Sequence, residues 1–439
     1  MNGFTTPGKV ARLTIAGIAT AASWAALTGS ASAAAPCDLV AAPNGSDSAA
    51  GTVDAPLKTA QSLSDSLSSG QTGCLRTGSY KEGDDEVEIG TANVTLTSYP
   101  GERAEIQGRI WISKQGDGVT VSNLDLDGRN PSDLPSPTVN ADDVVIAGND
   151  ITNYHTAICV SLGSADEYGA AHRTIVEENR IHDCGHMPAT NQDHGIYVNT
   201  SEDAIIRNNY IYDNADRGIQ LYPDAQNTLV TGNVIDGNGQ GVIFGGHETS
   251  ASSNNTVENN VITNSKIRDN VESSWAEGRV GSGNVARNNC VGGGAYDEGD
   301  GGILDGEGFK AVDNLLEIPK FTADLQVPEG DPCAAILAGS KAPTAPTGTQ
   351  GPAAVTIDTS DKTVSTDETI AVTGKAPGAS TVRIMILRKG SWKKLGRAKV
   401  STAGKYRLSV RLTNPGKQSL KAVAGGLRDS KPVKLRVQK

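Results

Sequence analysis

The chain has 439 residues, 51 of them Gly and only 4 each Phe and Trp, and a formal net charge of −11. So few large side chains argue against one thick hydrophobic core and favour a stack of short strands and tight turns. The charge is divided: residues 34–349 hold 18 Lys and Arg against 45 Asp and Glu, a net of −27, whereas residues 350–439 hold 19 against 5, a net of +14. This asymmetry predicts two domains with different partners.

The first 33 residues have the features of a secretory signal peptide. Lys9 and Arg12 supply a positive start, residues 13–27 are apolar but too short to span a membrane, and residues 31–33, Ala-Ser-Ala, form a small-residue cleavage site. No later segment is apolar enough to cross a bilayer. We therefore expect a secreted protein without a membrane span.

Six cysteines in an exported chain favour disulfides. Their order along the chain predicts three local pairs: Cys37 with Cys74, Cys159 with Cys184, and Cys290 with Cys333. Other pairings stay open, because order alone does not fix connectivity.

Residues 34–110 are expected to form an N-terminal cap and the first strands of a solenoid. Within them, residues 54–67 carry Leu57, Ala60, Leu63 and Leu67 at roughly helical spacing. A solenoid needs such a cap because its first turn would otherwise expose an open edge and an open core.

Between residues 149 and 291 the chain repeats Asn-x-Ile or a near copy of it six times. The copies begin at Asn149, Asn179, Asn209, Asn233, Asn260 and Asn289. A recurrence of this length corresponds to one turn of a solenoid. Each turn contains three short segments rich in stacked aliphatic residues, which predicts a parallel β-helix over residues 111–338, a single-stranded solenoid with three strands per turn. We interpret the asparagines as a structural ladder, because an Asn amide tolerates turn geometry and can bond to the copy one turn away.

The chain is expected to leave the solenoid after Leu304 and to fold back along it up to residue 338. Residues 339–352 are rich in Pro, Thr, Gly and Ala, which indicates a linker. Residues 353–439 alternate apolar and polar positions in several short segments, which predicts a small β-sandwich. The chain as a whole is therefore expected to be all-β.

The solenoid resembles the secreted right-handed parallel β-helix proteins of the pectate-lyase-like superfamily. The resemblance covers residues 45–310 and rests on the entry phrase at 51–82, the Asn ladder and the strand at 194–198. It implies a right-handed coil with a groove over the sheet of third strands. Members cleave or epimerise acidic polysaccharides or hydrolyse neutral ones, and some are tailspikes or adhesins. The C-terminal segment resembles a bacterial immunoglobulin-like module.

The repeat also predicts which side chains stack on the third strand of successive turns. We align these strands on Ile158, Ile196, Ile219 and Val242. Just before them lies a column of Thr156, His194, Arg217 and Gln240, preceded by His155, Asp193, Asp216 and Gly239. Outward-facing positions hold Cys159, Tyr197, Gln220 and Ile243, then Tyr222, with His247 in a following loop.

This stacking predicts one groove that contains His194, Tyr197, Arg217, Tyr222 and His247. A uronate lyase must neutralise the sugar carboxylate, remove the neighbouring proton and protonate the leaving oxygen. Arg217 suits the first role, His194 the second, and Tyr197 or Tyr222 the third. We therefore expect a carbohydrate-active enzyme, with β-elimination of an acidic, uronate-containing polysaccharide as the first hypothesis.

Three alternatives stay open. A uronate epimerase would use the same residues and return the proton from the other face of the sugar. A glycoside hydrolase would use Asp193 and Asp216, whose carboxylates are expected roughly 5 Å apart, the retaining-type spacing. A non-catalytic stack that binds glycans or mediates adhesion is the third. His182 falls in a different column, on another sheet, and is interpreted as part of a surface ladder.

No cofactor is required by these hypotheses, although Ca²⁺ could bind the acidic, Gly-rich stretch that contains Asp297, Asp300 and Asp305. The basic C-terminal module could bind an anionic glycan or the cell envelope through residues such as Lys393, Lys394 and Arg397. Nucleic acid is not an expected partner, because the module is exported and carries no matching motif.

Overall fold

The computed structural model describes residues 37–339 and 355–438, apart from 165, 167, 276–278, 361, 378, 380, 389–390, 425–429 and 431. The predicted signal peptide and nearly all of the predicted linker lie outside these residues. Within them, no helix is long and apolar enough to cross a membrane.

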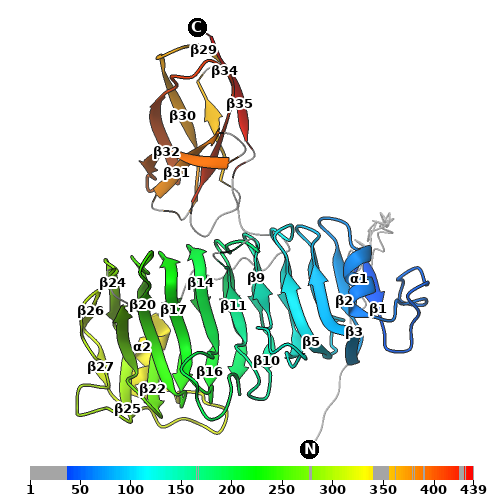
Figure 1. The fold of residues 1–439 in the computed structure, drawn as a ribbon, viewed down its shortest axis with the longest axis vertical. Coiled ribbons are helices and arrows are strands. Elements are labelled where there is room, and N and C mark those ends of the chain that lie inside the picture. Colours follow the sequence, from blue (N-terminus) through cyan, green and yellow to red (C-terminus); the bar gives the residue numbers. More distant parts are fainter. Residues whose placement is uncertain are drawn as a thin grey trace, which may run out of the picture. The chain divides into compact units, whose positions relative to one another are not determined.

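The solenoid is a stack of parallel strands arranged on three faces around one core (Figure 1). The first face contains β1 (Leu39–Ala41), β2 (Thr72–Leu75), β4 (Thr95–Ser98), β6 (Thr120–Ser122), β9 (Val145–Ala147), β12 (Ile175–Glu177), β15 (Ile205–Arg207), β18 (Leu229–Thr231), β21 (Thr256–Glu258), β24 (Asn284–Arg287) and β26 (Phe309–Val312). The second face contains β7 (Leu124–Asp127), β10 (Asp150–Thr152), β13 (Arg180–His182), β16 (Tyr210–Tyr212), β19 (Val234–Asp236), β22 (Val261–Ser265), β25 (Cys290–Gly294) and β27 (Leu315–Leu316).

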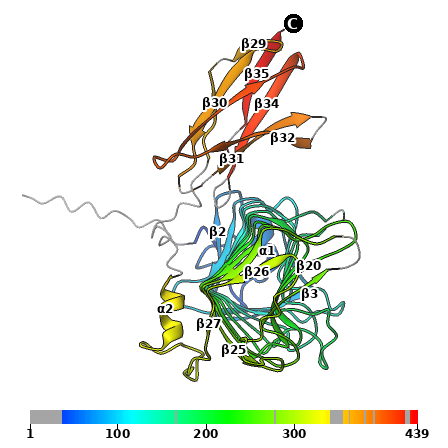
Figure 2. The same cartoon turned by 90° about the vertical axis from the view of Figure 1, so that its left-hand side faces the viewer.

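The third face, which we call the site face, contains β8 (Thr138–Val139), β11 (Val160–Leu162), β14 (Ile196–Glu202), β17 (Arg217–Gln226), β20 (Gln240–Gly246) and β23 (Val271–Trp275). The long strand β5 (Ala104–Ile112) pairs with β7 and with β8, and so joins the second face to the site face. On its other side β5 pairs with β3 (Gly78–Ile89). Viewed along the solenoid, the strands enclose a single interior (Figure 2).

Stacked aliphatic residues fill this interior. On the second face, Ile151, Ile181, Ile211, Ile235 and Ile262 align from turn to turn and are at most 1% exposed. Because paired strands lie ~4.8 Å apart, these equivalent side chains stack from turn to turn within one core. The all-β parallel solenoid predicted from the repeat is therefore confirmed.

The Asn ladder is confirmed in atomic detail. It runs through Asn149, Asn179, Asn209, Asn233, Asn260, Asn289 and Asn314. In each step the backbone N–H and the Nδ2 amide donate to the Oδ1 of the next Asn, at 2.9–3.1 Å. The residue before each ladder Asn has a positive φ, for example 58° at Glu178. The ladder thus satisfies the buried polar groups of a tight corner.

The N-terminal end of the core is covered by α1 (Ala60–Ser66). The Thr59 side chain accepts from the Ser62 backbone N–H, which fixes the start of this helix. Leu63 packs inward over Gly73, where an added Cβ would lie 3.0 Å from the Leu63 Cγ. The helix is shorter than the predicted apolar pattern because the N-cap falls at Thr59.

Three disulfides join Cys37 to Cys74, Cys159 to Cys184 and Cys290 to Cys333, with Cα–Cα distances of 5.6, 5.7 and 5.5 Å. These are the pairs predicted from chain order. The last one ties α2 (Pro332–Gly339) to β25.

One register prediction is wrong. Val160, not Ile158, pairs with Ile196, so the third strand of that turn begins two residues later than predicted. The delay arises at a corner where the Asn153 amide donates to the carbonyls of Ala157 and Ile158. Consequently Ser161, rather than Cys159, aligns with Tyr197.

The C-terminal residues form a separate pair of sheets with their own apolar core. One sheet contains β28 (Asp358–Thr359), β30 (Thr369–Lys375) and β33 (Lys405–Arg411). The other contains β29 (Thr363–Ser365), β31 (Thr381–Arg388), β32 (Ser391–Lys399), β34 (Gly416–Val423) and β35 (Val433–Gln438). Their pairing is antiparallel except between β29 and β35.

Candidate functional site

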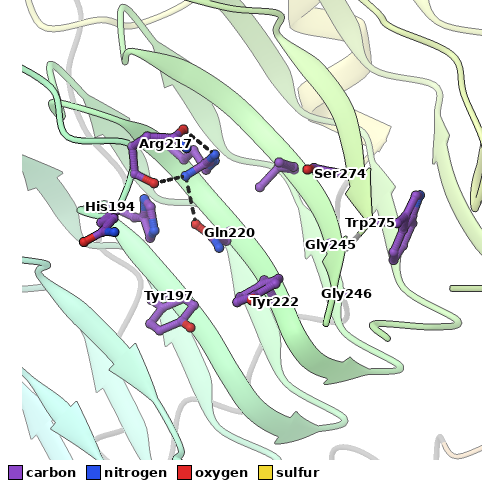
Figure 3. A pocket seen from close by; sticks show the side chains of 12 residues that line it. His194, Tyr197, Arg217, Gln220, Tyr222, Gly245, Gly246, Ser274 and Trp275 are labelled. Atoms are coloured by element: carbon purple, nitrogen blue, oxygen red, sulfur yellow. Dashed lines mark hydrogen bonds between the residues drawn. The ribbon is translucent and has the colours of Figure 1, made fainter. Parts of the chain in front are cut away.

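A pocket of about 490 Å³ opens on the site face over β14, β17, β20 and β23 (Figure 3). Its position follows from the register, which places Tyr197 beside Gln220 and Arg217 beside Gln240. The pocket is lined by Asn191, Gln192, His194, Tyr197, Arg217, Gln220, Tyr222, Ile243, Gly245, Gly246, Ser274 and Trp275. The described lining residues include no Asp or Glu, although the solenoid as a whole is strongly acidic.

Arg217 is a buried cation held by neutral groups. Its side chain donates to the Oε1 of Gln240 at 3.0 Å, the Oε1 of Gln220 at 3.2 Å, and the carbonyl and Oδ1 of Asn191 at 2.9 and 2.6 Å. Among the described residues, no carboxylate lies within ion-pair distance of this guanidinium. The residue is only 6% exposed. Since a buried charge is stabilised by an opposite charge, Arg217 favours an anion in the pocket.

The predicted fork-like grip of Arg217 on a carboxylate needs correction. Four hydrogen bonds already occupy most of the five N–H donors of the guanidinium. Arg217 can therefore attract an anion by its charge, but it has few N–H groups left to donate hydrogen bonds to that anion. Arg217 also holds the loop before His194, because two oxygens of Asn191 accept hydrogen bonds from the guanidinium. The backbone of Asn191 has a φ of 69°.

His194 is 2% exposed, and its Nδ1 has no hydrogen-bond partner within the described part of the chain. Burial first, and the nearby Arg217 charge second, hold the pKa of His194 well below its usual value of 6.5. The imidazole is therefore neutral at physiological pH, so one of its two ring nitrogens carries a lone pair. The Tyr197 ring meets the imidazole edge to face, with ring centroids 5.6 Å apart.

Tyr197 and Tyr222 lie partly buried on the same side of the pocket (Figure 3). Burial raises the pKa of Tyr197 to about 12, so its hydroxyl keeps its proton near neutral pH. A protonated phenol beside a neutral imidazole provides a proton donor and a proton acceptor in one pocket.

Four of the five residues predicted to share one groove are brought together: His194, Tyr197, Arg217 and Tyr222. His247 is not. It lies exposed in the turn after β20, where its backbone exchanges hydrogen bonds with Ser250, and it does not line the pocket.

Asp193 and Asp216 also lie outside the pocket lining, and both carboxylates are bonded to the loop before His194. Asp216 accepts from the backbone N–H groups of Gln192 and Asp193 at 2.8 and 2.9 Å. Asp193 accepts from the backbone N–H and the Nδ1 of His186 at 3.2 and 2.8 Å. These contacts give both carboxylates a part in folding the loop.

In the stretch predicted as a Ca²⁺ site, the side chains of Asp297 and Asp300 accept hydrogen bonds from nearby backbone N–H groups. Asp297 accepts from the N–H groups of Gly293, Gly299 and Gly301, and Asp300 accepts from that of Gly302. Asp305 is exposed. Within residues 37–339 and 355–438, where described, no three His, Cys, Asp or Glu side chains are grouped to hold a metal ion, so these aspartates do not form a shared cage.

Sequence reasoning missed Asn191, Gln192, Ser274 and Trp275. The first two come from the long loop between Cys184 and His194, and its length is a usable signal because long loops on a rigid scaffold often carry binding residues. Trp275 gave a usable signal, because it is one of only 4 Trp in the chain and ends a strand of the site face.

Comparison with known proteins agrees with this architecture. Residues 138–311 match the family model described as "Right handed beta helix region". A segment of 105 residues is 34% identical to "Pectate lyase PEL9" of Emericella nidulans. The aligned segment covers 24% of this chain and 23% of that protein. The match thus spans about a quarter of the relative.

Solved structures with a similar fold include pectate lyase Pel9A, at a TM-score of 0.46 and 12% identity over 66% of this chain and 80% of that one. A second is the A-module of the mannuronan C-5 epimerase AlgE4 of Azotobacter vinelandii. Its TM-score is 0.35 and its sequence identity 16%, over 56% of this chain and 87% of that one. The solenoid is a parallel β-helix, and its residues 138–311 match the right-handed family model. In this chain it is followed by a separate β-sandwich.

Proposed function

We propose that the chain is a secreted, carbohydrate-active enzyme that cleaves an acidic, uronate-containing polysaccharide by β-elimination. One observation carries this proposal: a buried guanidinium, with no carboxylate at ion-pair distance among the described residues, lies beside a neutral imidazole and a protonated phenol, in a pocket whose described lining contains no acid. The name of the Emericella nidulans relative, a pectate lyase, supports the same substrate class. The three disulfides support an oxidising, extracellular setting.

The proposed reaction assigns one proton movement to each group. The uronate carboxylate lies against the Arg217 charge, which stabilises the negative charge that develops when the neighbouring C–H bond breaks. His194 accepts that proton. The electron pair forms the new C=C bond and expels the glycosidic oxygen, which takes a proton from Tyr197 or Tyr222. Solvent then removes the proton from His194 and restores the phenol.

The composition of the pocket also bears on how an acidic solenoid could bind an acidic polysaccharide. A solenoid of net charge −27 repels a polyanion at long range. A carboxylate-free pocket that contains Arg217 offers local attraction where the reaction occurs. The basic C-terminal module, which we propose binds an anionic glycan or the cell envelope, supplies a second attraction that should weaken with salt.

A panel of acidic and neutral polysaccharides, assayed with and without a chelator, tests this function. Elimination leaves an unsaturated sugar that absorbs in the ultraviolet, and we expect this product from at least one uronate polymer. New reducing ends without that absorbance would indicate hydrolysis. Deuterium uptake from heavy water without cleavage would indicate epimerisation, which the same residues could perform.

A further inference from the structure

Trp275 ends β23 on the site face and is fixed at the far wall of the pocket. Its Nε1 donates to the carbonyl of Glu307 at 2.6 Å, and the same carbonyl accepts from the Ser273 hydroxyl at 2.9 Å. The indole is partly buried and packs against the edge of the solenoid core. Figure 3 shows it across Gly245 and Gly246 from Tyr222.

Glycines make room for these two rings. A Cβ on Gly245 would lie 2.9 Å from the Tyr222 Cδ2, and one on Gly246 would lie 2.9 Å from the Trp275 Cε3. A Cβ on Gly281 would lie 2.7 Å from the indole Cη2, and one on Gly308 would lie 2.3 Å from the indole Cζ2.

The backbone does not require glycine at three of these positions. Gly245, Gly246 and Gly281 have φ values outside the left-handed region, so other residues could adopt the same backbone conformation. At Gly245 and Gly246 the nearest atoms to an added Cβ belong to the aromatic rings, which explains the missing side chains, whereas at Gly281 a Cβ would first meet the Ser252 carbonyl oxygen, at 2.0 Å.

We infer that Trp275 is a stacking platform for a sugar residue of the same polysaccharide, at a subsite separate from the one where the bond breaks. This inference rests on the proposed function of the pocket. Trp275 lies three strands from β14, roughly 14 Å along the solenoid at the spacing of paired strands. It therefore contacts a sugar other than the reacting one, and the polysaccharide runs across the strands, along the solenoid axis. An amphipathic ring with an apolar face is a suitable partner for a fixed indole.

The test compares full-length Trp275→Ala, Trp275→Phe and Gly246→Val with the wild-type chain on a uronate polymer and on its oligomers, from the dimer upward. The wild type should gain kcat/KM as the oligomer lengthens. Trp275→Ala should remove that gain, with KM for the polymer raised about tenfold, the factor that 1.4 kcal/mol represents, and with kcat little changed. Gly246→Val should act similarly by displacing the indole, whereas Trp275→Phe should keep most of the gain.

Melting temperatures of all three variants control for folding, and Trp275→Phe keeps an aromatic ring if Trp275→Ala is unstable. Affinity electrophoresis in gels that contain the uronate polymer or a neutral polymer separates this inference from the proposed function. Weaker binding by Trp275→Ala to a polymer that the wild type binds but does not cleave would uphold the subsite and refute the lyase. A folded Trp275→Ala chain with wild-type length dependence and binding would overturn the subsite, and if Trp275→Ala does not fold, a folded Gly246→Val chain with those properties would do the same. A wild type that binds no polymer would also overturn it.

Discussion

Two histidines from one turn of the solenoid lie on different faces and differ in chemistry. His182 ends β13 on the second face, and His194 precedes β14 on the site face. The Nε2 of His182 bonds to Asp150 at 2.9 Å and its Nδ1 bonds to Asp183 at 2.7 Å, whereas the Nδ1 of His194 has no partner among the described residues. One imidazole is fully engaged, and the other retains a free bonding position.

The charge states differ for the same reason. Burial alone would lower the pKa of His182, but hydrogen bonds to Asp150 and Asp183 outweigh it and raise the pKa above 6.5. Burial and Arg217 both lower the pKa of His194. The solenoid register thus separates a histidine paired for stability from one suited to accept a proton, which a list of histidines in the sequence would treat alike.

The largest expected effect is loss of activity in His194→Gln. Gln keeps much of the side-chain volume but cannot accept a proton at neutral pH, so kcat should fall by roughly 10²–10⁴, the usual contribution of a general base. The melting temperature should stay within a few degrees of the wild type. Steady-state rates on the best uronate polymer check this, and a variant that retains most of its kcat would remove His194 from the reaction.

Arg217→Gln should lower kcat by roughly 10²–10³, as the loss of a charge-stabilising donor does in other enzymes. It should also raise the pKa of His194, because one of the two causes of its depression disappears while burial remains. A histidine titration followed by NMR would show this shift and leave His182 unmoved. An unchanged His194 titration would mean that Arg217 does not act on the imidazole.

Two tyrosines provide a matched pair. Tyr197→Phe should reduce kcat by about 10² if its hydroxyl protonates the leaving oxygen. Tyr212→Phe removes the hydroxyl of the ring that stacks on His182, with centroids 4.9 Å apart, and should leave kcat unchanged. Equal activity of the two variants would assign the proton donation to Tyr222 or to solvent.

The smallest effect is a pH-dependent change in stability in His182→Phe, which keeps an aromatic ring over Tyr212. Since the folded state raises the pKa of His182, its ion pairs stabilise the protein fully below about pH 6.5. That stabilisation is lost as the pH rises through the higher folded value. The variant should lose about 1 kcal/mol at low pH, because the partner carboxylates are more than a third exposed. Urea unfolding across pH checks this, and a difference that grows with pH would contradict it.

The sequence predicted those features that depend on the regular repeat. The Asn ladder, the alignment of Tyr197 with Gln220 and of Arg217 with Gln240, and the separation of His182 from His194 all follow from counting one turn at a time. These predictions succeed because a stack of parallel strands allows little freedom of register.

Predictions that depended on irregular segments failed. Ile158 was misaligned because the Asn153 corner delays the strand, and His247 was misplaced because the chain turns away after Gly246. The hydrogen bonds that Asp193 and Asp216 make to the loop, and the glycines around Trp275, depend on side-chain positions that no repeat encodes.

The most direct test of this comparison is the rate at which His194→Gln and His182→Phe form unsaturated product from one uronate polymer, relative to the wild-type chain. We predict that His182→Phe keeps the wild-type rate at pH 7 and that His194→Gln loses it by at least about 10²-fold. Loss of activity in His182→Phe with retention in His194→Gln would place the reaction on the second face and contradict the account.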